Sequence, residues 1–397
     1  MKLKMPELEI GIRIQRKDGT VEEYSEPGHS WTRNAWNCAF SCITDAPGDG
    51  TSTYGAGYMN ARRTDGFTTS GTTSTYHRGG AGTNAGFSPT AGQVVCGIRV
   101  GSGDAAFDID ATSLDAEILN GTSAGRLEHA AFEYPDVSIS STQFTALLTR
   151  QFTNSSGGDV SIREIALYNY SRFYSSTLRT YMFARDLLAG AIVLENTEIL
   201  EVMYRIRLNV SGMGADGWTR NAWNFVFASL CDCTGDDEGL FGAGYMSSRR
   251  VAGDIYSSPT SFAYRGTQAI DSGGFGVAAA GIHAGTGDTA FSVNDYALAS
   301  VIGSGTGAGQ LTYGANSATA TAYSSKKWTA TISRTFTNGS GADIAIKEIG
   351  LYWQGGLFST ATQFLFYRKV LDSTVTITNG SSHTFNIEIT KDFGEID

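Results

Sequence analysis

The sequence has few charged residues, and the acidic ones outnumber the basic ones. Charged residues make up 17% of the 397 positions and the formal net charge is −10, whereas about a quarter of an average protein is charged. Affinity for nucleic acid depends mainly on Lys and Arg side chains that neutralise phosphates, so we expect neither nucleic acid nor an anionic lipid surface as a partner. A polar but weakly charged surface favours contact with neighbouring subunits.

The sequence also lacks long apolar runs. The best candidate, Leu187 to Leu194, is far shorter than the roughly 20 residues that span a bilayer. The basic start Met1-Lys2-Leu3-Lys4 is followed by a charged, alternating segment and not by the apolar core of a signal peptide. We therefore expect no membrane partner, and a chain kept in the cytoplasm unless it is exported by a route that its own sequence does not encode.

Cysteine and histidine are scarce, and their positions do not indicate a metal or catalytic site. The cysteines are odd in number and do not match between the two halves of the chain, so we expect reduced packing residues. The histidines lack metal spacing, and the common nucleotide, hydrolase and metalloprotease motifs are missing. We assign no catalytic, cofactor-binding or metal-binding residue. The cysteines of the sequence are Cys38, Cys42, Cys96, Cys231 and Cys233, and its histidines are His29, His77, His129, His283 and His383.

One segment gives a weak metal signal. Cys231-Asp232-Cys233 is followed by Asp236-Asp237-Glu238, but a second cysteine pair and the spacing of a calcium loop are both missing. Asp49 is the only acid in the matching turn of the other half. A solvated turn is the preferred interpretation, and a cation site is the alternative.

The most informative feature is an internal repeat. The seven residues Trp31 to Asn37 recur letter for letter at Trp218 to Asn224, and Gly55 to Met59 recurs at Gly242 to Met246. Further matches follow in the same order along the chain. The sequence therefore predicts one fold written twice, with a first domain at 1–209 and a second at 210–397.

Each half begins with one predicted helix. Apolar residues between Trp31 and Ile43 fall on one helical face, with Arg33, Asn37 and Ser41 opposite, and Ser30 is a suitable N-cap. The second copy repeats this pattern from Trp218 to Leu230. A further segment, Leu8 to Tyr24, predicts a hairpin that has no clear counterpart in the second copy. We expect it to be an arm that packs on a neighbour.

The rest of each half reads as short strands between turns. Residues 144–153 alternate in polarity and predict a half-buried strand that turns at 154–159 and returns along 160–168. Arg150 and Glu164 fall on the apolar faces of these two strands. Because a lone buried charge is costly, we expect an Arg–Glu bridge between them. Arg334 and Glu348 occupy the same places in the second copy.

Three other features have structural interpretations that compete with ligand binding. The Gly-rich runs at 101–104 and 285–288 precede strands, so we expect turns whose glycines adopt positive φ and no phosphate loop. The pairs Arg62-Arg63 and Arg249-Arg250 suggest inter-subunit salt bridges, with an anionic ligand as the alternative. The glycosylation sequons at Asn120, Asn154 and Asn338 have little weight without a secretory signal.

Five segments of the second half form a distinctive pattern of turn and core residues: 281–292, 295–298, 309–313, 333–341 and 347–352. This pattern resembles a β-sandwich module found in virion proteins of tailed bacteriophages, whose modules also often carry an opening helix and a closing Arg-Asp-Leu strand pair. The likeness covers most of each half. The first copy departs from it at Arg99-Val100, which replace small residues, and at Ala111, which stands in place of Asp295.

The resemblance implies an all-β fold of two tandem homologous β-sandwich, jelly-roll-like domains, each with one short α-helix near its start. It also implies a non-enzymatic virion protein, made in the host bacterial cytoplasm and assembled symmetrically into a ring, collar, tail or capsid surface. Its partners would be further copies and other virion proteins. The alternative is a receptor- or glycan-binding module on such a particle, because 18 Tyr residues could stack on sugar rings.

Overall fold

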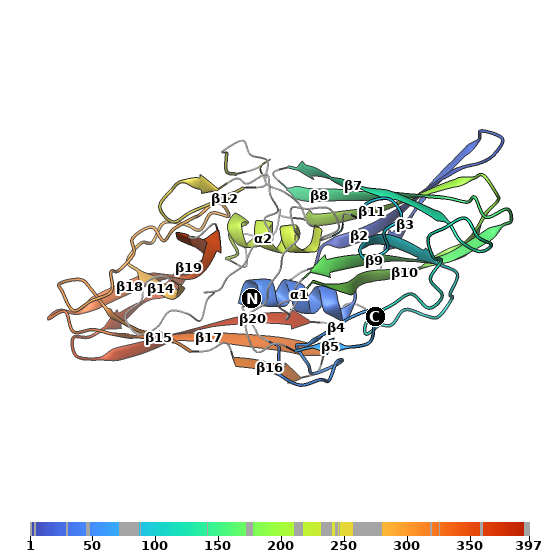
Figure 1. Ribbon diagram of the computed structural model, residues 1–397. Helices are drawn as coiled ribbons and strands as arrows, with labels where there is room; N and C mark the ends of the chain where they lie inside the picture. Colours follow the sequence, from blue (N-terminus) through green and yellow to red (C-terminus); the bar gives the residue numbers. More distant parts are fainter. Residues whose placement is uncertain are drawn as a thin grey trace.

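The computed structural model describes most of the chain, and the described part is mostly β-strand with two helices. The molecule is elongated, with the helices at its centre and the strands reaching toward both ends (Figure 1). This confirms the all-β class and one helix near the start of each half. The described residues are 2–3, 5–28, 31–44, 48–70, 87, 89–140, 142–171, 178–209, 217–231, 240–242, 245, 247–256, 280–317, 320–324, 326–357 and 360–392.

The first half contains two sheets that are in contact. Their strands are β2 (Glu7–Gln15), β3 (Val21–Gly28), β6 (Gly97–Gly101), β7 (Glu128–Ile139), β8 (Gln143–Thr153), β9 (Val160–Ser171), β10 (Arg179–Leu194) and β11 (Ile199–Asn209). One sheet has the order β3-β2-β11-β8-β7 and the other has the order β10-β9-β6. Tyr204 on β11 donates a hydrogen bond to Asp186 on β10, which links the two sheets through their inner faces.

The second half repeats this arrangement. Its strands are β14 (Gly281–Gly285), β15 (Thr312–Asn316), β16 (Ala320–Ser324), β17 (Lys327–Thr337), β18 (Ile344–Leu357), β19 (Thr360–Ile377) and β20 (Ser382–Asp392). The order β14-β18-β19 matches β6-β9-β10, and the order β20-β17-β15 matches β11-β8-β7, with β16 also pairing with β17. The N-terminal strand β1 (Lys2–Leu3) adds to β20 in parallel, at Thr390 and Lys391.

The connection between β8 and β9 differs from the predicted hairpin. Both strands exist, and burial alternates along β8 and at the start of β9, but β8 lies in the five-stranded sheet and β9 in the three-stranded one. The turn therefore crosses from one sheet to the other. Asn154 fixes this crossing, because its side-chain amide donates to the carbonyl oxygens of Gly158 and Leu194. Asn338 makes the equivalent bonds to Ala342 and Ile377.

The N-terminal hairpin is confirmed, and its strand β2 pairs with β11 of its own chain. β2 pairs with β11 along its whole length, with Ile10 opposite Tyr204, and β3 pairs with the other side of β2. Every second residue of β2 points into the core, where Leu8, Ile10, Ile12 and Ile14 are buried. The hairpin thus supplies one whole row of core side chains to the first half.

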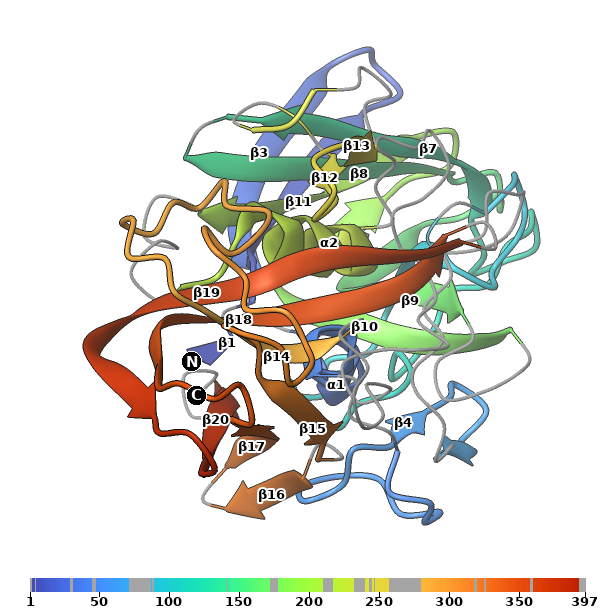
Figure 2. The ribbon, with the colours of Figure 1, turned by 90° about the vertical axis from the view of Figure 1, so that its left-hand side faces the viewer.

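The helices α1 (Arg33–Thr44) and α2 (Arg220–Cys231) join the halves. They contact each other at the centre of the molecule, as the end-on view in Figure 2 also shows. α1 additionally meets the second half, where Lys391 on β20 donates to the Asn37 side chain at 2.7 Å. α2 meets the first half through Phe227, whose ring lies 5.6 Å from that of Phe144 on β8. One hydrophobic core consequently runs through both halves.

The polar side of α1 is buried as well as its apolar side, because Arg33, Asn37 and Ser41 are all buried. Arg33 pairs with Asp110 of the same half, whereas Asn37 contacts both Asn60 of the same half and Lys391 of the other half. The expected N-cap Ser30, and the expected linker at 210–215, lie outside the described residues.

Candidate functional site

The two buried glutamates that the sequence singled out are held by backbone and arginine. Glu164 is fully buried, and its carboxylate accepts hydrogen bonds from the backbone N–H groups of Gly103, Asp115 and Ala116 at 2.8–3.2 Å. Arg185 on the neighbouring strand completes the site with Nε at 3.0 Å. Glu348 and Arg368 form the same centre in the second half, with Nε at 2.7 Å. The carboxylate therefore ties a loop and a strand together.

The predicted partners of these glutamates are wrong. Arg150 lies in the other sheet, and its guanidinium donates to three backbone carbonyls, those of Gln93, Ile98 and Ala130. Arg334 likewise binds the carbonyls of Ala280, Ile282 and Gly314. Burial lowers the pKa of Arg150 and of Arg334 from 12.5 to about 10. Both arginines act as cross-sheet ties to backbone oxygen.

The Gly-rich runs are not the predicted turns: each begins at the last residue of a strand, β6 or β14, and continues as an irregular loop, and positive φ is not the reason for their glycines. Gly101 and Gly103 both have ordinary φ, since neither is among the positive-φ residues of the chain. A Cβ added at either would lie 2.5–2.6 Å from the Glu164 carboxylate oxygen. Gly285 and Gly287 stand in the same relation to Glu348. These glycines are needed because the loop closes directly around a buried carboxylate.

The buried histidines are neutral core residues. Burial, with a neighbouring arginine as a lesser cause, lowers the pKa of His129 and of His283 to about 3. His129 packs edge-on against Phe152, with ring centroids 4.9 Å apart. His283 lies over Tyr352 at 4.1 Å. Neither position fits a metal ligand or a general base, and no group of His, Cys, Asp and Glu in the described residues could hold a metal ion.

The paired arginines brace short hairpins. Arg62 lies on β4 (Ala61–Arg62), which pairs with β5 (Thr68–Thr69), and Arg249 lies on β12 (Ser248–Arg249), which pairs with β13 (Ile255–Tyr256). Each donates through Nε to a glycine carbonyl in its own turn. Arg63 pairs with Asp65, and Arg250 pairs with Asp254. These hydrogen bonds and ion pairs lie within each hairpin, and the inter-subunit bridge and the anion site stay predictions.

The other candidates also have structural roles where they are described. Cys38, Cys96 and Cys231 are buried, as expected of packing residues, whereas the Cys42 side chain, Cys233 and 236–238 lie outside the described residues. The sequon residues Asn154 and Asn338 are fully buried. Asn120 accepts a hydrogen bond from the His129 N–H. None of the helices in the described part has the length and apolarity to cross a membrane.

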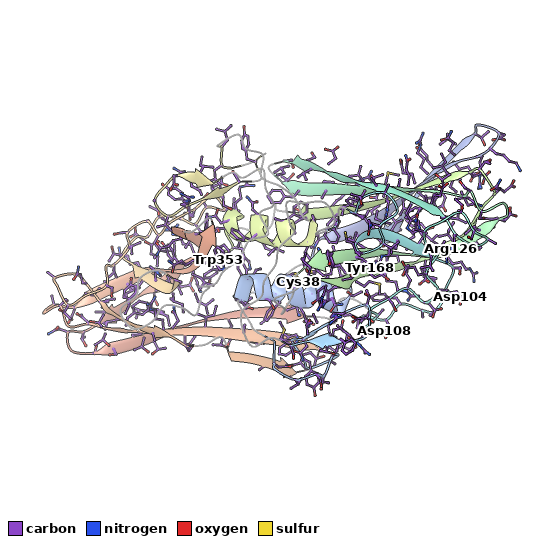
Figure 3. All side chains as sticks on the ribbon, viewed as in Figure 1. Cys38, Asp104, Asp108, Arg126, Tyr168 and Trp353 are labelled. Carbon is purple, nitrogen blue, oxygen red and sulfur yellow. The ribbon has the colours of Figure 1, made fainter. Side chains whose placement is uncertain are left out.

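The aromatic residues mostly belong to the core. All six Trp residues are buried, and Trp353, labelled in Figure 3, stacks on Phe366 at 5.6 Å. Tyr168 lies inside the first half in the same figure, with the Arg99 guanidinium 3.9 Å from its ring centroid. In the described part of the chain, the large aromatic side chains that are well exposed are Tyr24 and Phe67.

The surface does contain one apolar groove. It has a volume of about 480 Å³ and lies between β19 and β20 in the second half. Ile349, Leu371, Phe385 and Ile387 supply its apolar wall, and Lys369 and Glu388 lie at its rim. A more polar hollow of about 320 Å³ lies beside β2, β3 and β11 in the first half, where Glu9 pairs with Arg205 and Arg207.

Comparisons with known proteins returned no relative: no family model, no curated protein and no solved structure matches this chain. The candidate site is therefore defined by geometry alone. It is the groove beside β20, because the buried ionic centres are occupied by contacts within the fold.

Proposed function

We propose that the chain is a non-enzymatic structural subunit of a tailed bacteriophage particle, built from two tandem β-sandwich, jelly-roll-like domains at 1–209 and 210–397. It would assemble by symmetric contacts into a ring, collar, tail or capsid-surface component, with further copies and other virion proteins as partners. The observation that carries the proposal is the duplicated sheet order joined by α1 and α2 through one core. Such a duplication yields a rigid block with similar faces, which suits symmetric assembly.

The buried charges support a structural role. The centres at Glu164 and Glu348 use their hydrogen-bonding capacity on backbone N–H groups and on Arg185 and Arg368. A carboxylate held in this way stabilises a loop and is poorly placed to transfer a proton. The glycan-binding alternative requires clustered exposed aromatics, and among the described residues the well-exposed Tyr24 lies on β3 and Phe67 lies in the separate turn between β4 and β5.

Sedimentation velocity and negative-stain electron microscopy of the purified full-length chain test this function. We expect rings or a lattice with uniform symmetry that forms as the protein concentration rises. A chain that stays monomeric at every concentration and binds saccharides on a glycan array would instead establish the binding module.

A further inference from the structure

The two halves differ at one edge of their long sheets. β11 pairs with β8 on one side and with β2 on the other. β20 occupies the equivalent place in the second half and pairs with β17. On its other side, the described strands supply only β1, which covers Thr390 and Lys391. No described strand takes the place of β2 beside Thr384 to Ile387.

The burial of nearby side chains also differs between the two halves. Leu188 and Ile192 on β10 are buried in the core that the β2 aliphatic residues complete. Their equivalents on β19, Leu371 and Val375, are only partly buried. The groove beside β20 is thus the space that a row of side chains like those of β2 fills in the first half.

The backbone of this edge is oriented for strand addition. The Ser381 carbonyl accepts a hydrogen bond from Asn338, on the β17 side. Backbone groups along an antiparallel strand alternate between its two sides, so those of Thr384 and Asn386 point away from β17. Both side chains are exposed. Exposed sheet edges are usually blocked by charge or proline, as Glu22, Glu26 and Pro27 block β3, but 382–387 contains neither proline nor an acidic residue.

We propose that the β20 edge and its groove receive an extended strand from a different protein, in the manner in which β2 covers β11. This inference rests on the proposed assembly function and names a partner for it. The edge is continuous with an existing strand-addition contact, that of β1. The incoming strand would run antiparallel to β20 over Ser382–Glu388 and place aliphatic side chains at alternate positions in the groove.

The numbers of hairpins and of open sheet edges in each chain explain why the strand comes from another protein and not from a second copy. Among the described strands, each chain has one hairpin of the β2–β3 type and two equivalent edges, β11 and β20. Any exchange of hairpins between identical copies therefore leaves one edge per copy uncovered. The exposed β3 edge of a second copy is also unsuitable, because it would bring Glu22 and Glu26 to an edge that carries Glu388.

The charge of the edge specifies the partner further. In the first half, Glu9 on β2 lies opposite Arg205 and pairs with it. The residue equivalent to Arg205 on β20 is Glu388. A glutamate at the place of Glu9 would lie opposite another carboxylate on β20, so a strand that binds here should carry a different residue at that place, with aliphatic residues on the opposite face.

Hydrogen exchange on the intact chain, with a synthetic peptide as the probe, tests this inference. The peptide has the sequence of residues 6–16 with Glu9→Lys, and its control also carries Ile10→Asp and Ile12→Asp. In the protein alone we expect fast exchange at the Thr384 and Asn386 amides and slow exchange at the equivalent Glu201 and Met203 amides. The peptide should slow exchange at Thr384 and Asn386, and the control peptide should not.

Two variants of one residue separate backbone pairing from side-chain effects. Asn386→Pro removes an outward N–H and should weaken peptide binding about tenfold, whereas Asn386→Ala keeps the N–H and should bind within about twofold. Equal binding by both variants would overturn the inference, as would slow exchange at Asn386 in the dilute protein. Protection that appears with concentration and without peptide would identify a second copy as the occupant and refute the counting argument. Symmetric assembly is measured by the sedimentation and microscopy experiments, so the proposed function and the strand addition at β20 can be refuted independently of each other.

Discussion

Replacing Glu164 by glutamine should reveal how strongly the buried ionic centre holds the first half together. The change leaves one carbonyl oxygen for a site in which three backbone N–H groups and Arg185 now donate to a carboxylate. The new amide also points hydrogens at a backbone donor, and the buried Arg185 guanidinium loses its charge partner. Removing one member of a buried pair costs about 3–5 kcal/mol.

Denaturant-induced unfolding of the full chain measures this cost. The matched control is Arg163→Ala, at the next residue, because Arg163 pairs with Asp104 at the surface, where the side chains are 45% and 70% exposed. Asp104 lies at the periphery of the molecule in Figure 3. The control should change the free energy of unfolding by less than about 1 kcal/mol. A Glu164→Gln variant as stable as that control would refute the reasoning.

Three other substitutions test separate parts of the fold. Gly103→Ala should destabilise the chain by thermal denaturation, because its Cβ would lie 2.6 Å from the Glu164 carboxylate, and Gly158→Ala, in open space, should not. His129→Tyr, which introduces the residue of the second half, should reduce acid sensitivity. In the folded chain His129 binds a proton only below a pKa of about 3, whereas in the unfolded chain it does so below about 6.5. The free energy of unfolding therefore falls as the pH drops below 6.5, by about 2 kcal/mol at pH 5. The same pH profile in the variant and the original chain would contradict this. Burial lowers the pKa of Lys391, so stability should rise with pH toward the ordinary lysine value, and Lys391→Met should remove that rise in urea titrations.

The sequence predicted elements better than it predicted their partners. The alternation along 144–153 and 160–168 gives two strands and correctly turns Arg150 and Glu164 inward. Alternation specifies which face is buried but not which sheet a strand joins, and the short connecting turn suggested a hairpin. The actual partner of Glu164 is Arg185 on β10. The sequence shows this residue only as an Arg that recurs near the end of each half.

The helices show a second limit. Their position and length follow from apolar spacing, but Asn37 is buried in part against Lys391 of the other half of the chain. One signal was available: Lys391 stands where the first half has Leu208. A charge at a core position of one copy indicates a contact that the other copy lacks, in this case with Asn37. Tertiary contacts of this kind are invisible to periodicity within one segment.

The N-terminal hairpin shows what comparing the two copies can add. Its alternating Leu and Ile residues predicted a strand pair, and its absence from the second copy suggested contact with a neighbour. It covers β11 of its own chain, whereas no strand in the described part of the chain takes the equivalent place beside Thr384 to Ile387 of β20. The difference between the two copies therefore indicates a neighbour only indirectly, because it identifies the β20 edge at which we propose that a neighbour binds.

Electron cryo-microscopy of the phage particle in which we propose that this chain assembles tests the central claim most directly. The account predicts symmetric copies in the particle, each with a strand of a different protein lying antiparallel to β20 along Ser382–Glu388. A particle without this chain, or copies whose β20 edge and groove face solvent, would contradict it.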